Sequence, residues 1–495
     1  MAKSLSFRKT KIVATIGPAS WDKEKLGELI RGGMNIARLN FSHGELERHS
    51  ETVRNIREVA MELGAPVGIL QDLQGPKIRL NNFKGERVLN KGDKVIVTSS
   101  GHESGEKLVV DFASLHEFVS PGQSVFIDDG IMELQVKKVV GVDLHCVVVH
   151  GGVARPRKGV NLPDSKIPIA SMTEKDLEDL RNGIPLEFDY VALSFVRAVK
   201  DIVDLKELLN KLGSKARVVA KIEKKEAIEN IEAIVEASDA IMIARGDLAV
   251  EIGQVHLPAV QKKITKLCNQ KGKPVITATQ MLDSMQENSR PTRAEITDVA
   301  NAVLDGSDAL MLSGESAFGN YPVRSVETMH EIICEVEKQP GIYYKFKNRK
   351  KDQFTVPESI AISTVLCSKQ LAAKTIVCMS TTGRTAQMIS KYRPKAKLIA
   401  VTYKDEALNR LELCWGVQTL RINKFDNTED AFAQIESLLK EYKIVAPGDH
   451  VVLTLGLPVQ QGQKTNSVRV FTIGSDGAVK DNKASKKPVR FFAKT

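Results

Sequence analysis

The stretch VVAKIEKKEA, residues 218–227, shows how the chain folds and where its chemistry lies. An apolar run ends in Lys221, Ile222 and Glu223, and a segment with helical periodicity follows it. Residues two apart in a strand lie on the same face, so Lys221 and Glu223 are expected to point the same way. The stretch therefore predicts a buried strand that carries a cation and a carboxylate at its end, followed by a helix.

Seven other segments have the same form, a short β-rich run that in most cases is followed by one amphipathic helix. The eight strands are expected at residues 11–17, 34–40, 67–73, 190–195, 217–223, 240–247, 274–280 and 309–315. The helices between them include residues 22–32, 45–63, 199–212 and 257–271, and a capping box at Thr292 and Glu295 announces another. Eight such units predict an α/β fold, a closed (β/α)8 TIM barrel; an open doubly wound sheet is the alternative.

Two regions do not follow this pattern of one strand and one helix. Between the third and fourth strands, residues 76–169 contain short strands separated by turn signals, which predicts a small β-barrel lid domain inserted into the barrel. After the polar run KFKNRKKDQ (345–353), αβ units resume and predict a C-terminal α/β regulatory domain. The expected boundaries are 1–75 with 170–339 for the barrel, 76–169 for the lid, 340–475 for the C-terminal domain and 476–495 for a basic tail.

Composition limits the class of protein. The 495 residues are 42% hydrophobic and 27% charged, which is typical of a globular protein. The six cysteines form no CxxC pair and no histidine cluster accompanies them, so neither a disulfide framework nor a zinc site is expected. A chain without disulfides fits a reducing compartment, so we expect a cytoplasmic location. No secretory signal or membrane-spanning run is expected. The net charge of +10 is dispersed, which disfavours nucleic-acid binding and leaves two interpretations, general solubility and attraction of small anionic substrates.

Polar side chains stand at the carboxyl ends of seven of the eight expected strands. They are Arg38 and Asn40, Asp72, Ser194, Lys221 and Glu223, Arg245 to Asp247, Thr279 and Gln280, and Ser313 and Glu315. In a (β/α)8 barrel the carboxyl ends of the strands meet at one mouth, where active sites lie. The pattern therefore predicts an active site at this mouth.

Glu223 and Asp247 end adjacent expected strands and are candidates for holding a divalent cation, and two carboxylates supplemented by water or substrate oxygens suit Mg²⁺. With Lys221 and Arg38 beside them, the site would suit a phosphorylated substrate and phosphoryl transfer. An internal ion-pair network that stabilises the barrel is the alternative. The stretch GLPVQQGQKT (456–465) lacks the spacing of a P-loop, so a nucleotide is expected under the lid, with Lys158 as a candidate contact.

Several motifs together resemble pyruvate kinase across essentially the whole chain. They are KTKIVATIGPAS (9–20), GMNIARLNFSHG (33–44), KGVNLP (158–163), AKIE (220–223), ARGDLAVE (244–251), ITATQMLDSM (276–285) and the run 291–322 that begins PTRAEITDVANAV. The resemblance implies a barrel, a mobile lid and a C-terminal domain in a homotetramer. It also implies Mg²⁺-dependent (or Mn²⁺-dependent) transfer of phosphoryl from phosphoenolpyruvate to ADP, giving pyruvate and ATP in glycolysis.

The resemblance also assigns roles to residues. Glu223 and Asp247 match metal ligands, and Lys221 matches the side chain that stabilises the migrating phosphoryl group. Substrate contacts are implied for Arg38, Gly246, Asp247 and Thr279, and nucleotide contacts for Asn40, His43, Arg79 and Lys158. The proton donor to the enolate stays open, with a water linked to Thr279 as one possibility.

One departure from the family pattern concerns LQDLQGPKIRL (70–80). Much of the family has Thr, Lys, Glu and Thr at the positions of Leu73, Gln74, Lys77 and Leu80, and binds K⁺ near residues matching Asn40, Ser42, Asp72 and Leu73. A lysine ammonium is a compact charge that can replace such an ion. We therefore predict that Lys77 supplies this charge and that activity needs no K⁺; the alternative is that Lys77 points to solvent.

A second site is expected at STTGRTA (380–386), which follows a predicted strand and opens a helix. Hydroxyls and free N–H groups at a helix start can bind an anion, although plain capping is the alternative. By resemblance, Ser380, Thr381, Thr382, Gly383, Arg384 and Thr385 would bind a phosphorylated allosteric effector, with the loop 459–466 as the second half. Two other functions stay open: a Mg²⁺-dependent barrel lyase or aldolase acting on pyruvate or phosphoenolpyruvate, and an inactive paralogue that serves as a binding protein.

Overall fold

A computed structural model describes residues 7–99, 107–346, 354–425, 427–457 and 464–473. The expected basic tail, residues 476–495, and most of the expected effector loop, residues 459–463, lie outside the described residues. In the described part of the chain, no helix combines the length and the apolar character that crossing a membrane would require.

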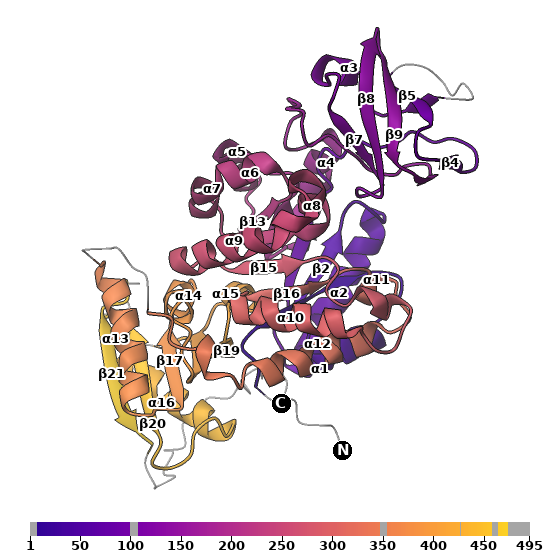
Figure 1. Ribbon diagram of the computed structural model, residues 1–495. Coiled ribbons are helices and arrows are strands. Elements are labelled where there is room, and N and C mark those ends of the chain that lie inside the picture. Colours follow the sequence, from indigo (N-terminus) through magenta and orange to yellow (C-terminus); the bar gives the residue numbers. More distant parts are fainter. Residues whose placement is uncertain (1–6, 100–106, 347–353, 426, 458–463, 474–495) are drawn as a thin grey trace.

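Eight parallel strands form a closed barrel, as the strand pattern predicts (Figure 1). Around the barrel their order is β1-β16-β15-β14-β13-β12-β3-β2, which rules out the open doubly wound sheet. The strands are β1 (Lys11–Ile16), β2 (Ile36–Asn40), β3 (Gly68–Asp72), β12 (Tyr190–Leu193), β13 (Arg217–Ile222), β14 (Ala240–Ala244), β15 (Val275–Ala278) and β16 (Ala309–Leu312).

Alternate strand residues face the barrel interior and the surrounding helices. One buried cluster takes side chains from all eight strands, among them Val13, Val219 and Met242. Their sequence neighbours, such as Ile12, pack outward against the helices. The helices are α1 (Lys23–Gly32), α2 (Leu46–Leu63), α4 (Glu174–Gly183), α5 (Val199–Lys211), α6 (Lys225–Glu229), α7 (Ile231–Ala237), α8 (Arg245–Ile252), α9 (Leu257–Lys271), α10 (Arg293–Asp305), α11 (Gly314–Ala317) and α12 (Pro322–Val336).

The predicted capping box at the start of α10 is confirmed. The Thr292 side chain accepts from the backbone N–H of Glu295, and the Glu295 carboxylate accepts from the N–H of Thr292 at 2.7 Å. These two bonds satisfy helix N–H groups that have no partner inside the helix, so the helix begins at this residue.

Most of the predicted strands end one to three residues earlier than expected, and two of them end three residues earlier. The sixth stops at Ala244, and Arg245 already begins α8; the eighth stops at Leu312, and Glu315 lies in α11. Both corrections have the same physical reason, because a helix starts directly at the strand end and takes up the polar residues that alternation alone would have placed in the strand. The N–H groups of the first turn of α8 are thereby brought to the barrel mouth.

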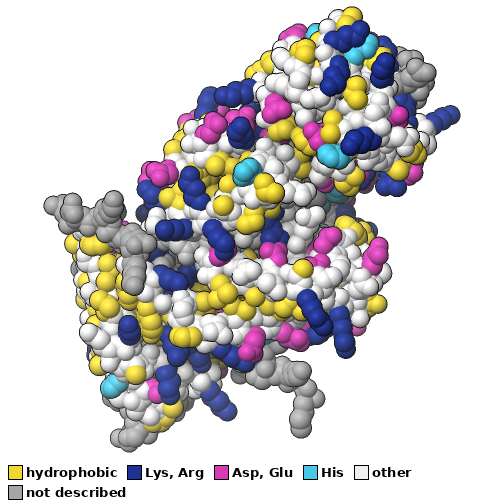
Figure 2. Space-filling view, viewed as in Figure 1, with side chains coloured by type: hydrophobic (Ala, Val, Ile, Leu, Met, Phe, Trp, Pro, Cys, Tyr) yellow, Lys and Arg dark blue, Asp and Glu magenta, His cyan; other side chains and the backbone are white. Residues whose placement is uncertain are grey.

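The insert between β3 and α4 has its own sheet and core. Its six-stranded sheet has the order β11-β7-β8-β9-β5-β6, with the pair β10-β4 beside it, and its core includes Val97, Leu134 and Leu144. The elements are β4 (Arg87–Leu89), β5 (Lys94–Thr98), β6 (Lys107–Val109), α3 (Leu115–Phe118), β7 (Ser124–Ile127), β8 (Met132–Val140), β9 (Asp143–His150), β10 (Gly152–Ala154) and β11 (Val160–Asn161). Figure 2 shows the insert as a separate lobe, with Lys and Arg spread over the visible face rather than gathered on one patch.

The C-terminal part of the chain is a second α/β unit at the opposite end of the barrel from the insert (Figure 1). Its sheet has the order β19-β18-β17-β20-β21, with only β21 antiparallel. Its elements are α13 (Val356–Gln370), β17 (Thr375–Met379), α14 (Arg384–Ser390), β18 (Lys397–Thr402), α15 (Asp405–Leu411), β19 (Val417–Arg421), α16 (Thr428–Glu441), β20 (His450–Leu455) and β21 (Ser467–Thr472).

Candidate active site

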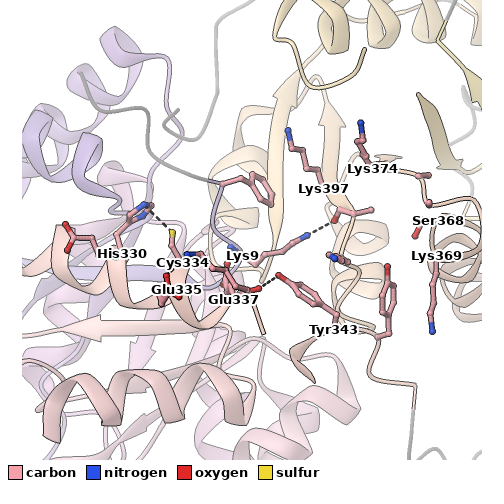
Figure 3. Close-up of a pocket in the computed structure, with 18 residues that line it drawn as sticks. Lys9, His330, Cys334, Glu335, Glu337, Tyr343, Ser368, Lys369, Lys374 and Lys397 are labelled. Carbon is pink, nitrogen blue, oxygen red and sulfur yellow. Dashed lines mark hydrogen bonds and ion pairs between the residues drawn. The ribbon is translucent and has the colours of Figure 1, made fainter. Parts of the chain in front are cut away.

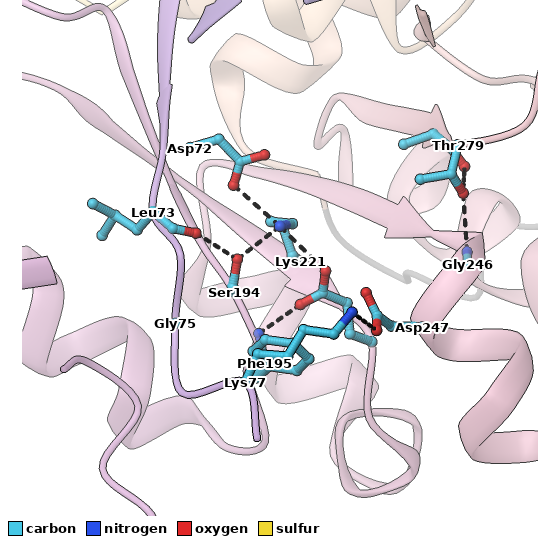
Figure 4. Close-up of polar contacts among 12 residues, drawn as sticks. Asp72, Leu73, Gly75, Lys77, Ser194, Phe195, Lys221, Gly246, Asp247 and Thr279 are labelled. Carbon is cyan, nitrogen blue, oxygen red and sulfur yellow. Dashed lines mark hydrogen bonds and ion pairs between the residues drawn. The ribbon is translucent and has the colours of Figure 1, made fainter. Parts of the chain in front are cut away.

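Lys221 stands at the centre of the polar cluster at the barrel mouth (Figure 4). Its Nζ donates to Ser194 Oγ at 2.7 Å and lies 3.1 Å from Asp72 Oδ1 and 3.2 Å from Glu223 Oε1. Lys221 and Glu223 therefore point the same way, as strand alternation predicts. Burial alone would lower the pKa of Lys221, but the charges of Asp72 and Glu223 outweigh it and raise that pKa above its ordinary value. The ammonium is charged at neutral pH.

Asp72 holds two cations in place. Its Oδ2 accepts from Arg38 Nε at 2.6 Å, while its Oδ1 faces Lys221. Burial would raise the pKa of Asp72, but the charges of Lys221 and Arg38 prevail and lower it. A second bond runs from the Arg38 guanidinium to Thr15 Oγ1 at 2.9 Å. The carboxylate therefore fixes both cations at the mouth, where a phosphate could meet them.

Glu223 and Asp247 form a pair of neighbouring carboxylates. Glu223 Oε2 accepts from the N–H of Phe195 at 2.7 Å. Burial raises the pKa of Glu223; the Lys221 ammonium opposes this, and the negative charge of Asp247 adds to it. Two hard oxygen donors that repel one another are stabilised by a cation between them. Within the described residues no group of three or more His, Cys, Asp or Glu could hold a metal, so these two would need water or substrate oxygens as further ligands, which suits Mg²⁺.

Lys77, which follows β3, contacts this carboxylate pair from the lid side. Its Nζ lies 2.8 Å from Asp247 Oδ1 and 3.3 Å from Asp129 Oδ1 of the insert. Burial would lower the pKa of Lys77, but the charges of Asp247, Asp129 and Glu223 outweigh it and raise that pKa. The alternative that Lys77 points to solvent is wrong. Its ammonium faces Asp247 rather than Asp72.

Thr279 and Gly246, which follow the adjacent strands β15 and β14, contact each other at the mouth. The Thr279 hydroxyl accepts from the N–H of Gly246 at 2.9 Å and donates to the carbonyl of Ala278 at 2.7 Å. Both Thr279 and Gln280 have positive φ, +66° and +53°, a conformation that non-glycine residues seldom adopt. Such backbone strain is typical of functional sites.

Arg245 and Glu315 do not face the mouth, although the sequence pattern counts them there. The Arg245 guanidinium donates to Asp298 at 2.7 Å and to the carbonyl of Thr279 at 2.6 Å. The buried Glu315 accepts from the N–H groups of Leu282 and Ser313. Arg245 is therefore a positioning residue for the strained Thr279 turn, and Glu315 secures a neighbouring loop. Their residue types alone carry no signal that separates them from mouth residues.

The residues expected to contact a nucleotide divide between barrel and lid. On the barrel side, burial lowers the pKa of His43, and the nearby charges of Arg79 and Arg38 lower it further. Asn40 Oδ1 accepts from the N–H of Ser42 at 3.2 Å. In the insert, Lys158 pairs with Asp128 at 2.8 Å. The structure brings His43 into the field of Arg79 and Arg38 and holds Lys158 on the insert.

Sequence reasoning missed three participants. Asp129 in the insert contacts Lys77, the backbone N–H of Phe195 binds Glu223, and Asp298 anchors Arg245. The two adjacent acidic residues in FIDDG (126–130) were a signal that could have identified Asp129. The backbone N–H of Phe195 and the distant carboxylate of Asp298 have no signal in the sequence.

The expected effector segment forms a capped turn at the start of α14. Ser380 Oγ accepts from the N–H of Gly383 at 3.0 Å, and the hydroxyls of Thr385 and Thr465 lie 2.6 Å apart. Thr465 belongs to the described end of the loop 459–466 that was expected to complete the site. The segment 380–385 and the described end of the loop 459–466 are therefore neighbours. The bond from Gly383 to Ser380 shows that capping of the turn is present as well.

Comparison with known proteins identifies the family. A family model described as pyruvate kinase, barrel domain, matches residues 7–326, and one described as pyruvate kinase, alpha/beta domain, matches residues 358–471. A pyruvate kinase of Geobacillus stearothermophilus is 43% identical over 472 residues, 94% of this chain and 80% of that protein. One of Clostridium perfringens is 40% identical over 475 residues, 94% of this chain and all of that protein. The crystal structure of a pyruvate kinase from Cryptosporidium parvum has a TM-score of 0.89 at 36% identity, covering 95% of this chain and 98% of that one.

The Lys77 contact predicts competition with a metal ion. Since Lys77 Nζ lies 2.8 Å from Asp247 Oδ1, a divalent cation that uses this carboxylate must displace the ammonium. We expect Lys77→Met to tighten Mn²⁺ binding to the substrate-free enzyme about tenfold, which is about 1.4 kcal/mol. Electron paramagnetic resonance of free Mn²⁺ measures this directly. The exposed Lys211→Met is the control, and unchanged or weaker binding in Lys77→Met would contradict the competition.

Proposed function

The chain belongs to the pyruvate kinase family, and from this premise we propose that the cluster around Lys221 is the centre that transfers phosphoryl from phosphoenolpyruvate to ADP. The observation that carries the proposal is the Lys221 ammonium, which is held between Asp72, Ser194 and Glu223. The chain is a phosphotransferase by its family, so the lyase and the inactive binding protein considered from the sequence have no support.

Lys221 and Arg38 would neutralise the phosphoryl group of the substrate. Both cations are fixed by the single carboxylate of Asp72, so little reorganisation is needed when the phosphoryl group leaves the enolate oxygen for ADP and negative charge develops on that oxygen. Preorganised charges of this kind contribute more to the transition state than to the ground state, because the site is partly shielded from water. In this mechanism Lys221 and Thr279 are the catalytic residues.

Glu223 and Asp247 would hold the divalent cation, Mg²⁺ or Mn²⁺. When bound, the metal supplies positive charge to the phosphate and carboxylate oxygens of the substrates. Glu223 is oriented for this by the N–H of Phe195. The positively charged Lys77 ammonium, displaced from Asp247 by the metal but still near the pair, would supply the charge for which other family members use K⁺.

The start of α8 would bind the substrate carboxylate. The N–H groups of Gly246 and Asp247 belong to the first turn of this helix, where an anion is favoured. Thr279, whose hydroxyl already contacts the N–H of Gly246, would share this anion. Threonine is a poor acid, so we assign protonation of the enolate to a water held by Thr279.

The nucleotide would lie between barrel and lid. Asn40 and His43 would contact it from the barrel side, and Arg79 and Lys158 from the lid, where Arg79 is held by the carboxylate of Asp111 and the carbonyl of Arg157. We retain residues 1–75 with 170–339 as the barrel domain, 76–169 as the lid and 340–475 as the regulatory domain. The arrangement in Figure 1 supports these boundaries, because the insert stands over the mouth and the C-terminal unit at the other end. We further propose a cytoplasmic homotetramer.

Removing the Lys221 charge tests the centre. In a lactate-dehydrogenase-coupled assay, pyruvate formation should require ADP, and Lys221→Met should lower kcat by about 10²–10³ with little change in KM for phosphoenolpyruvate, since the charge acts on the transition state. The exposed Lys225→Met on α6 is the control, and a thermal melt confirms folding. A kcat within tenfold of wild type would reject the role of Lys221.

Independence from K⁺ is tested by changing the monovalent salt. Turnover in tetramethylammonium or Tris buffer should rise less than about twofold when KCl is added, because Lys77 already provides the charge. In contrast, Lys77→Glu should become K⁺-responsive. A large rise of the wild-type rate with K⁺ would show that the ammonium does not substitute for the ion.

The segment Ser380 to Thr385 would bind a phosphorylated activator, a sugar phosphate or a nucleoside monophosphate. Its capped turn and the neighbouring Thr465 hydroxyl support this. Titration of activators against Thr382→Glu should show activation reduced by about tenfold or more, because the new carboxylate repels a phosphate. Thr382→Ser, which keeps the hydroxyl, should respond as wild type does, and equal activation of Thr382→Glu would place the effector elsewhere.

A further inference from the structure

A large cavity lies between the barrel and the C-terminal unit, away from both sites described above (Figure 3). Its volume is ≈ 1010 Å³, at the upper end of the range typical of small-molecule sites. One wall consists of Phe7, Lys9 and the end of α12 with the segment after it, and the other of the end of α13 and the starts of β17 and β18. The catalytic mouth lies at the opposite ends of the barrel strands.

The wall from the C-terminal unit is positively charged. It contributes Lys369, Lys374, Lys395 and Lys397 and no carboxylate to the lining. Lys374 reaches Asp449 at 3.2 Å, and Lys369 lies over the Tyr344 ring at 5.0 Å. Lys395 and Lys397, in contrast, make no ion pair with any described residue. Two ammonium groups of this wall are therefore available to a ligand.

The acidic residues on the barrel wall do not compensate for them. Glu331 is paired with Arg324 at 2.9 Å, and Glu335 with Lys338 at 2.5 Å. The Glu337 carboxylate accepts from the backbone N–H groups of Lys9 and Thr10 at 2.7 and 2.6 Å. Glu331 and Glu335 are offset by cations on their own side, so the four lysines of the opposite wall outweigh the remaining carboxylate, Glu337, and the cavity keeps an excess of positive charge.

The floor of the cavity adds to this excess. The buried Lys9 donates from Nζ to the carbonyls of Pro394 and Ala396, at 3.0 and 2.5 Å. Burial lowers the pKa of Lys9 to about 7; the Glu337 charge opposes this, and the Lys397 charge lowers it further. The repulsion between Lys9 and Lys397 would be relieved by an anion bound near them.

We propose that this inter-domain cavity binds a small phosphate-bearing anion, whose phosphate oxygens contact Lys395 and Lys397. A phosphate monoester carries close to two negative charges at neutral pH, which matches two unpaired ammonium groups, and lysine binds phosphate as a point charge. The rest of the ligand would lie along Phe7, Tyr343 and Tyr344, which line the cavity and offer flat apolar surface. This site is separate from the segment Ser380 to Thr385 and stands whether or not that segment binds an effector.

A ligand here would contact both structural units at once. Phe7 in the lining belongs to the barrel domain, whereas Lys395 and Lys397 belong to the turn before β18 and its first residue. Binding would therefore stabilise one placement of the C-terminal unit on the barrel. The ligand would act as an allosteric effector rather than as a substrate.

Calorimetric titration of the intact enzyme tests the cavity. The probes are inorganic phosphate, glucose 6-phosphate, AMP and fructose 1,6-bisphosphate, each at constant ionic strength. The cavity variant is Lys395→Gln with Lys397→Gln. The matched control is Lys440→Gln with Lys443→Gln, which removes two lysines at the end of α16 that do not line the cavity. Thr382→Glu separates this site from the capped turn of α14.

We expect at least one probe to bind wild type, the control and Thr382→Glu with the same affinity, and to bind the cavity variant at least about tenfold more weakly, a change of about 1.4 kcal/mol. Basal turnover without a probe should be equal in wild type and in the control variant. If no probe binds wild type with a Kd below about 1 mM, or if the cavity variant binds every probe as the control does, the proposal is overturned.

Discussion

The whole mouth depends on keeping one buried ammonium charged. Taking an ion out of water costs several kcal/mol, and only good partners offset that cost. The Lys221 ammonium has three such partners, which are the side chains of Asp72, Ser194 and Glu223. These residues belong to β3, the end of β12 and the end of β13, which are consecutive around the closed barrel although the insert separates β3 from β12 in the chain. Closure of the barrel is therefore the condition under which this lysine can be buried and still carry its charge.

Much of the fold follows from local patterns. All eight barrel strands and the main helices have the apolar periodicity of their type, and the Thr292 capping box marks a helix start that the structure confirms. Prediction fails where a contact distant in sequence decides. Alternation cannot show that Arg245 binds the Thr279 turn and Asp298, or that Lys77 faces Asp247 rather than Asp72. The inter-domain cavity has no sequence signature either, because its walls come from segments far apart in the chain.

Electrostatics link the carboxylate pair to the lid. Lys77 contacts Asp247 of the barrel and Asp129 of the insert with the same ammonium group. A cation bound at Asp247 would weaken the first contact and leave the second, so the charge state of the pair and the position of the insert are not independent. Lys77 is thus a residue through which a cation at Asp247 would affect the contact between barrel and insert.

The C-terminal unit is attached to the opposite end of the same strands. Lys11, the first residue of β1, donates to the carbonyl of Val417 at 2.6 Å and pairs with the buried Glu412 at 3.4 Å. The Tyr190 hydroxyl at the start of β12 donates to the carbonyl of Arg410 at 2.7 Å. Breaking one partner of a buried pair costs about 3–5 kcal/mol, so these contacts hold the unit in a defined orientation. The strand β12 leads from Tyr190 directly to Ser194, whose hydroxyl accepts from Lys221. A shift of the C-terminal unit would therefore reach the Lys221 ammonium along a single strand.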